Sequence, residues 1–190
     1  EVRTLQDSIS QESNGLTSFR VIASMDEGNW VSEPNLGYSV DNIAPETPDN
    51  FTGLAYINQG PKVALSWMYP FDEVDFSYYK VYRSNELISL TSELNFIDSN
   101  LESNIDLEYW ITAVDIHENE SESTDIYSFN FLKGDLNLDE VLDILDIIPI
   151  IHFIVESEVP AESQFWYSNL NDDNYVDVLD ILLLINIILN

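Results

Sequence analysis

The sequence contains no cysteine, and its 190 residues include only 6 lysines and arginines against 35 aspartates and glutamates. The absence of cysteine excludes disulfide bonds and thiolate metal sites. The formal net charge of −29 at pH 7 argues against partners rich in phosphate, such as nucleic acid or anionic membrane surfaces. It favours cations as small partners. An alternative is that acidity outside two C-terminal loops described below only keeps an extracellular or salt-adapted protein soluble.

Targeting and membrane signals are also missing. The chain begins at Glu1 without methionine, a basic segment or an apolar leader, so we expect the C-terminal part of a longer protein. The longest apolar runs, 147–155 and 181–189, are too short to span a bilayer. With 45% hydrophobic residues, the chain has enough apolar side chains for a packed core.

Composition and the positions of proline and glycine divide the chain into three zones, 1–43, 44–132 and 133–190. The run Ala-Pro-Glu-Thr-Pro at 44–48 is a stiff, turn-rich connector between the first two zones. Lys133 and Gly134 mark the second boundary.

The middle zone has the alternating pattern of β-strands. The longest such runs are 63–70, 76–84 and 107–115, with shorter ones at 86–90, 94–97 and 126–131. Short strands separated by polar turns predict an antiparallel β-sandwich. The residues expected to share faces are Val63, Leu65 and Trp67, then Tyr79, Val81 and Arg83, then Leu107, Tyr109, Ile111 and Ala113.

This zone resembles a fibronectin type III domain over about 45–132. The resemblance rests on the proline-rich start, on Trp67 in the second strand, and on the run YYKVYRS in the third. It also rests on the penultimate strand, where Tyr109 begins the run YWITAVD. The resemblance implies that Tyr109 is the tyrosine-corner residue of the sandwich.

The first zone contains a partial copy of the second. Residues 19–29 align with 109–119, an offset of about one sandwich repeat. We therefore expect 1–43 to hold the last two strands of a truncated preceding sandwich. An isolated hairpin is marginally stable, so it should be partly disordered or lean on the next domain.

The third zone carries two acidic segments, 134–156 and 168–190, offset by 34 residues. In both, oxygen-bearing side chains occupy positions 1, 3, 5, 9 and 12 of a loop, and position 7 offers a backbone carbonyl, as in calcium-binding EF-hand loops. We therefore expect two calcium ions. The predicted ligands are Asp135, Asn137, Asp139, Val141, Asp143 and Asp146 in the first loop, and Asn169, Asn171, Asp173, Tyr175, Asp177 and Asp180 in the second.

An apolar run with helical spacing follows each loop. The spaced residues are Leu142, Leu145, Ile148, Ile151 and 154–155 in the first copy, and Val176, Leu179, Leu182, Leu183 and Ile187 in the second. Pro149 is expected to end or kink the first helix. Residues 157–167 are expected to form a short linking helix with Pro160 near its start.

These features together resemble a dockerin module, the duplicated loop–helix partner of cohesin, over 133–190. Aspartate at position 12 and the opening run GDLNLD carry the resemblance. It implies an all-α module with two calcium ions and a non-catalytic docking function. It also implies that positions 10 and 11 contact the partner, which are Ile144, Leu145, Val178 and Leu179 here; the alternative for these four is core packing.

Two departures concern position 6, where glycine is usual. Glu140 and Asn174 stand there, and glutamate tolerates a left-handed backbone less well than asparagine. The first loop is therefore expected to be strained or to open differently. The alternative for both loops is a solvated acidic turn without metal, although crowded carboxylates repel one another when no cation is present.

We interpret the chain as the non-catalytic C-terminal region of a secreted modular protein, extracellular or at the cell surface. Its dockerin-like module would bind a cohesin-like partner and tether an upstream polysaccharide-degrading or surface protein. The alternative is a calcium-stabilised structural tail whose module packs on its own sandwich. An enzyme role would lie upstream. His117 and His152 lack a catalytic context, and Tyr56, Tyr78 and Trp110 are either a sugar-binding surface or scattered aromatics.

Overall fold

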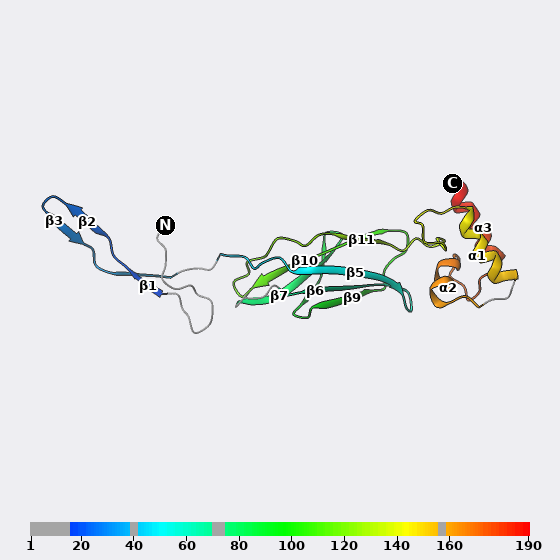
Figure 1. Ribbon diagram of the computed structural model, residues 1–190, viewed down its shortest axis with the longest axis horizontal. Coiled ribbons are helices and arrows are strands. Elements are labelled where there is room, and N and C mark those ends of the chain that lie inside the picture. The colour runs from blue at the N-terminus through cyan, green and yellow to red at the C-terminus, as the bar shows by residue number, and fades with distance from the viewer. Residues whose placement is uncertain (1–15, 39–41, 70–74, 156–158) are drawn as a thin grey trace.

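The computed structural model describes residues 16–38, 42–69, 75–155 and 159–190. A β-hairpin lies at one end, a β-sandwich in the middle and three helices at the other end (Figure 1). The predicted last residue of the strand at 63–70 and the predicted start of the linking helix at 157 fall outside the described residues. No helix in the described ranges is long and apolar enough to cross a membrane.

The hairpin is formed by β1 (Leu16–Phe19), β2 (Ile22–Met25), β3 (Gly28–Val31) and β4 (Asn35–Tyr38). β2 pairs with β3 and β1 with β4, so the predicted pair of strands is present, with each strand divided in two. Its apolar side chains face solvent: Val21 is 72% and Trp30 67% exposed. The origin of this hairpin as a truncated sandwich stays a prediction.

Two antiparallel sheets form the sandwich. One has the order β5 (Asp49–Ile57), β6 (Pro61–Met68), β9 (Asn95–Ser99). The other has the order β11 (Tyr127–Asn130), β10 (Asp106–Asp115), β7 (Phe76–Arg83), β8 (Glu86–Thr91). All the predicted strands are present. β5 was not predicted, because Phe51 is its one fully buried side chain and its sequence alternates poorly.

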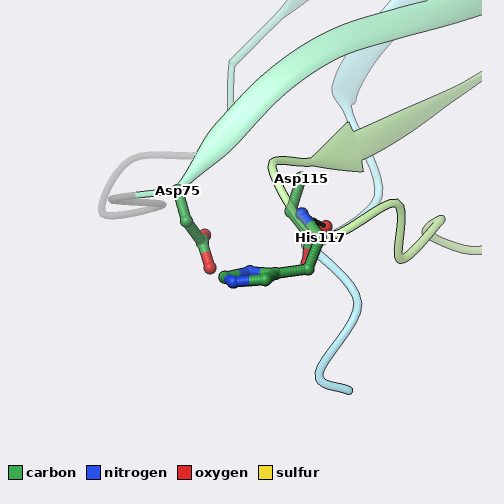
Figure 2. A group of neighbouring side chains, drawn as sticks. All are labelled: Asp75, Asp115 and His117. Atoms are coloured by element: carbon green, nitrogen blue, oxygen red, sulfur yellow. Dashed lines mark hydrogen bonds between the residues drawn. The ribbon is translucent and has the colours of Figure 1, made fainter. Parts of the chain in front are cut away.

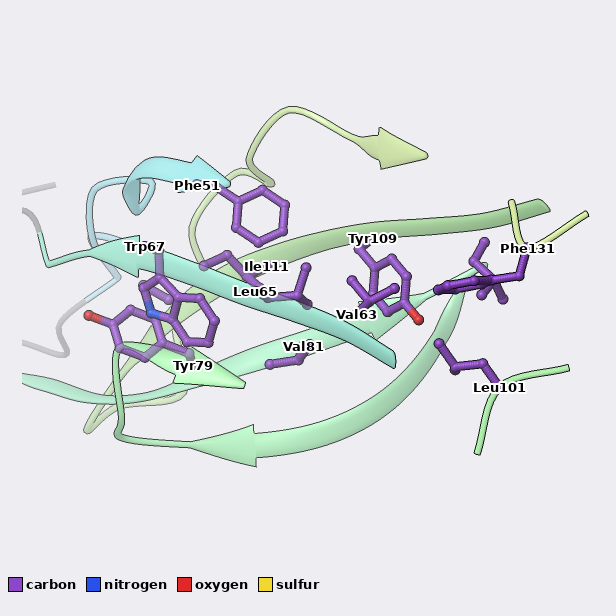
Figure 3. Packing of buried hydrophobic residues seen from close by; sticks show 12 residues of the cluster. Phe51, Val63, Leu65, Trp67, Tyr79, Val81, Leu101, Tyr109, Ile111 and Phe131 are labelled. Atoms are coloured by element: carbon purple, nitrogen blue, oxygen red, sulfur yellow. The ribbon is translucent and has the colours of Figure 1, made fainter. Parts of the chain in front are cut away.

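The core lies between the two sheets, where large side chains from both interdigitate (Figure 3). Val63, Leu65 and Trp67 alternate with more exposed residues along β6, as predicted. Trp67 meets Tyr79 edge-on across the core, with ring centroids 5.4 Å apart. The predicted inward faces are buried except at Arg83, which is half-buried and binds a carboxylate.

Tyr109 does not make a tyrosine corner, in which the hydroxyl donates to the backbone. Its side chain is fully buried and its hydroxyl donates to Oδ2 of Asp98, 2.8 Å away on the opposite sheet. The same oxygen accepts from Nη1 of Arg83 at 3.0 Å. The carboxylate of Asp98 therefore joins the two sheets, and the tyrosine-corner expectation was wrong because this carboxylate takes the place of the backbone acceptor.

Tyr109→Phe should lower the free energy of unfolding by about 1–3 kcal/mol at pH 7, the cost of removing a donor from a buried charged acceptor. Burial, and then the bond to Asp98, raises the pKa of Tyr109. The folded state therefore holds this proton more tightly than the unfolded chain, whose tyrosines titrate near pH 10. The stabilisation is present below about pH 10 and is lost as the pH rises above that value. Urea denaturation at several pH values should show a smaller alkaline loss in Tyr109→Phe than in the wild type.

The control for that experiment is Tyr78→Phe. Tyr78 donates to the exposed Glu118 at 2.9 Å, so its hydroxyl should contribute little. An equal loss of stability in the two variants would contradict a special role for the inter-sheet bond.

The helical module consists of α1 (Ile144–Val155), α2 (Glu162–Ser168) and α3 (Val178–Leu189). α1 packs against α3 around Ile147, Ile150 and Leu184. The helix α1 continues through Pro149, so this proline does not end it, and the expected alternative of a kink stays a prediction. The linking helix α2 is present and begins just after Pro160.

Only part of the helical spacing marks the core of the module: Leu142, Ile154 and Val176 pack against it. Leu145, Ile148, Ile151 and Val155 are exposed, as are Leu179, Leu182, Leu183 and Ile187. Within each helix, other packed residues lie one or two positions from these exposed ones. The reason is that the buried aspartate in the first turn fixes the rotation of the helix about its axis. Asp146 and Asp180 are each 0% exposed. Ile147 and Ile150 lie on the same side of α1 as Asp146, and Ile181 and Leu184 lie on the same side of α3 as Asp180.

The module also packs on the sandwich through α2. The ring of Trp166 meets Phe131 edge-on, with centroids 6.3 Å apart, and joins the sandwich core. Lys133 Nζ lies 5.7 Å from the centroid of the Trp166 ring and forms an ion pair with Asp172. The N–H of Gly134, at φ 101°, donates to the carbonyl of Tyr167 at 2.9 Å. The two parts are therefore joined by side chains as well as by the chain.

Candidate metal-binding loops

The aspartate at position 12 organises each loop in the same way. Oδ1 of Asp146 accepts from the N–H of Leu136 at 2.9 Å, and Oδ1 of Asp180 accepts from the N–H of Leu170 at 2.8 Å. The other oxygen of each accepts from the N–H at position 9, at 3.0 Å in the first loop and 2.9 Å in the second. Each carboxylate is thus held in one orientation inside its loop.

The aspartate at position 9 caps the helix that follows. Oδ1 of Asp143 accepts from the N–H of Leu145, and Oδ1 of Asp177 from that of Leu179, each at 2.7 Å. Positions 9 and 12 together form a capping box, which satisfies free N–H groups at the start of a helix. This arrangement is useful without metal, so it does not by itself indicate calcium.

Positions 1, 3 and 5 gather oxygens at the other side of the loop. Asp135 is 4% exposed, and its oxygens accept from the N–H groups of Asp139 at 3.2 Å and Glu140 at 2.9 Å. Nδ2 of Asn137 donates to Oδ2 of Asp139 at 2.8 Å, and the equivalent Asn171–Asp173 contact is 2.9 Å. The contacts between positions 3 and 5 are therefore repeated in the two loops, whereas those of position 1 differ.

Asn169, at position 1 of the second loop, is the most informative side chain. It is 5% exposed, and its Nδ2 donates to the carbonyl of Asp173. Its Oδ1 is buried, and no donor among the described residues bonds to it. A buried acceptor without a donor is costly, and a cation relieves that cost. The donor set of this loop therefore fits an oxygen-preferring metal ion.

The charges of the loops also fit a cation. Asp135, Asp146 and Asp180 are buried, and within the described residues no ion pair reaches any of them. Buried carboxylates without a counter-charge destabilise a fold unless a proton or a cation neutralises them. Lys133 pairs instead with Asp172, which is exposed at position 4 of the second loop.

The backbone differs from the expectation at position 6. Glu140 adopts a left-handed conformation, with φ 66°, whereas Asn174 is not among the described residues with positive φ. Position 4 is left-handed in both loops, at Leu138 with φ 60° and Asp172 with φ 58°. The strain expected at Glu140 is therefore present, and the left-handed conformation expected to suit Asn174 is not used.

The side chains expected to meet a partner lie at the start of α1 and at the start of α3. Ile144 is 70% and Leu145 51% exposed, and Val178 is 57% and Leu179 54% exposed. They do not form the core, which was the alternative. We call these four residues the apolar face of the module.

Other candidates are distributed differently. Tyr82 and Trp110 stack on each other, with centroids 5.5 Å apart, so each ring covers one face of the other. His152 is exposed on α1. His117 lies beside Asp75 and Asp115, a grouping that the sequence reasoning missed. The Asp-x-His spacing at 115–117 was the signal for two of the three residues, but nothing in the sequence places Asp75 beside them.

Comparisons with known proteins give limited information. No family model matches the sequence, and no curated protein matches it. Among solved structures, the Clostridium perfringens spore cortex lytic enzyme SleM is 21% identical with a TM-score of 0.43, over 61% of this chain and 38% of that one. The FN1–FN3 domains of chicken CNTN1 are 13% identical with a TM-score of 0.44, over 62% and 43%. The structure titled "FN3tt mut" is 19% identical with a TM-score of 0.40, over 47% and 98%.

These likenesses are too small to carry an argument about function. The chain spans less than half the length of SleM or of the CNTN1 fragment. Fibronectin type III-like domains are among the matches, in line with the sandwich topology described above. None of these three titles names a dockerin, so that resemblance stays a prediction from the sequence.

Proposed function

We propose that residues 133–190 form a dockerin-like module whose two loops each bind one calcium ion, and that the ordered module docks a cohesin-like partner through its apolar face. Asp135, Asn137, Asp139 and Asp146 would hold the first ion with Val141 O and, through water, Asp143. Asn169, Asn171, Asp173 and Asp180 would hold the second with Tyr175 O and Asp177. Bound calcium supplies positive charge to buried oxygens and does no chemistry on a substrate.

The observation that carries this proposal is the buried Oδ1 of Asn169, which accepts no hydrogen bond from the part of the chain that the structure describes. The contacts of the aspartate at position 12 in this loop otherwise repeat those of the first loop. A capping box explains positions 9 and 12, but it leaves Oδ1 of Asn169 unsatisfied. Extracellular calcium modules bind at about 0.1–1 mM, so calcium outside the cell would fill such loops and cytosolic calcium would not. We therefore propose an extracellular or cell-surface location, and the dockerin resemblance implies a tethering role for an upstream, polysaccharide-degrading or surface protein.

A second candidate function is favoured by the contact between α2 and the sandwich. Trp166 and Lys133 join the module to its own neighbour, as a calcium-stabilised structural tail requires. This contact uses α2, whereas the apolar face lies on α1 and α3. A tail function and an external partner are therefore compatible.

The test of calcium binding uses the full chain after chelator treatment. Calorimetric titration should find two calcium sites, and circular dichroism should show helix content rising with occupancy. Absence of both would overturn the proposal.

Docking is tested separately by calcium-dependent capture on an immobilised cohesin-like domain. Leu145→Asp together with Leu179→Asp should abolish capture while leaving the calcium titration unchanged, because both side chains point away from the core. Two calcium sites without capture of the wild type would leave the structural tail as the function.

Glu140→Gly should tighten calcium binding by the first loop about 5- to 10-fold. Glycine adopts the left-handed backbone at position 6 without the strain of about 1–2 kcal/mol that an L-residue meets there. Glu140→Gln is the matched control, since it removes the same charge and keeps Cβ. Calorimetry on both variants separates the two effects: equal affinities for them would contradict backbone strain as the cause.

A further inference from the structure

A group of potential metal ligands lies in the sandwich, away from both loops. Asp75, Asp115 and His117 each place one ligand atom so that all three atoms lie within 4.8 Å of one another (Figure 2). Figure 2 shows the carboxylate of Asp75 directed at the imidazole of His117, with Asp115 on the far side of the ring. Among the described residues this is the one group of three carboxylate or imidazole side chains with such spacing.

The backbone brings these residues together by strand pairing. Asp115 ends β10 and pairs with Phe76 at the start of β7, after a break in register at Val114. The N–H of Ile116 donates to the carbonyl of Asp75 at 2.9 Å and fixes the two segments to each other. Asp115 is the last residue of β10, Asp75 directly precedes β7 and His117 lies in the turn after β10, so two paired strands position the three residues.

Asp115 is oriented before any ion arrives. It is 1% exposed, and its Oδ1 accepts from the N–H groups of His117 and Asn119, each at 2.8 Å. Its Oδ2 accepts from Nδ2 of Asn119 at 2.7 Å. A carboxylate has about four acceptor positions, so one remains for a cation. Such support by hydrogen bonds is what orients the ligands of metal sites.

We propose that Asp75, Asp115 and His117 bind a divalent transition-metal ion of the zinc class. Two carboxylates attract any divalent cation, but an imidazole ligand favours zinc and its neighbours over calcium or magnesium. Zinc binds its oxygen and nitrogen ligands at about 2.0–2.2 Å, so the three atoms approach one another by side-chain rotation when the ion enters. Three protein ligands leave the fourth position to water or to a group from another molecule.

This site is independent of the calcium proposal, because it uses other residues and another class of ion. The test therefore begins with the full chain in a large excess of calcium, which fills the oxygen sites. Zinc is added and followed by calorimetry, and cobalt is added as a coloured substitute whose visible spectrum reports an imidazole ligand. We expect one saturable zinc site per chain and a rise in melting temperature with zinc.

The chain has two histidines, which give a matched pair of variants. His117→Gln should weaken zinc binding at least 10-fold and remove the cobalt spectrum, whereas His152→Gln on α1 should change neither. Asp75→Asn should also weaken zinc binding. If His117→Gln fails to fold, the zinc affinity of Asp75→Asn tests the proposal in its place. Asp115 is left unchanged because its carboxylate holds the turn that follows β10. Saturable zinc binding that survives both His117→Gln and Asp75→Asn, or no saturable binding in the wild type, would overturn the proposal.

Discussion

Asp146→Asn combined with Asp180→Asn should abolish calcium binding and prevent calcium from ordering the helical module, while the sandwich stays folded. Each aspartate is 0% exposed and accepts hydrogen bonds from N–H groups near both ends of its loop. An amide retains the shape but presents one oxygen where the carboxylate presents two. Position 12 supplies a carboxylate that is often bidentate, so each single variant should lose one site.

The size of the effect follows from linkage. When free calcium exceeds the dissociation constant about 100-fold, each occupied site stabilises the folded module by about 2.7 kcal/mol. The double variant should therefore lose about 5 kcal/mol of calcium-dependent stability, which exceeds the margin of a module this small. Calorimetry and circular dichroism with and without chelator measure the two losses.

Asp125→Asn is the control for charge. It removes one carboxylate from an exposed position on the sandwich and should leave both sites intact. If the double variant bound calcium as the wild type does, the aspartates at position 12 would be capping residues only. The capping box that they form with Asp143 and Asp177 would then be their whole role.

The fold of the sandwich could be predicted because its strands alternate between buried and exposed residues. Val63, Leu65 and Trp67 stand at every second position, and the structure buries all three. β5 was not predicted because Phe51 is its one buried residue, so its alternation of buried and exposed residues is weak. The acceptor for Tyr109 could not be predicted, since Asp98 and Arg83 meet it only through sheet packing.

The helices show a different limit. α1 and α3 are apolar on nearly every side, so a period of 3.6 residues fits more than one face of each helix. The rule that charged residues face solvent does not resolve the choice, because it would set Asp146 and Asp180 outward. The structure buries these carboxylates among backbone N–H groups, and the residues beside them become the core. The candidate ligands could be identified by spacing, whereas the rotation of the helices depended on their hydrogen bonds.

Trp166→Ala should uncouple the helical module from the sandwich. The tryptophan is half-buried, packs edge-on against Phe131 and joins the sandwich core, so its removal should cost about 2–4 kcal/mol. It also removes the ring beneath Lys133, whose ammonium group pairs with Asp172 in the second loop. The contact thus connects a calcium loop to the sandwich through two neighbouring side chains.

In the wild type, we expect calcium to raise the melting temperature of the sandwich as well as that of the module, because the ordered α2 stabilises the surface on which it packs. In Trp166→Ala, differential scanning calorimetry should show two transitions, with calcium shifting only that of the module. Trp30→Ala is the control, since Trp30 is 67% exposed on the distant hairpin and should leave the coupling intact. A calcium shift of the sandwich transition that persisted in Trp166→Ala would show that α2 is not the connection. The contact of Trp166 with the sandwich does not use the apolar face. If Trp166→Ala lost the coupling but was still captured by a cohesin-like domain, the structural role of calcium would be separate from its role in docking.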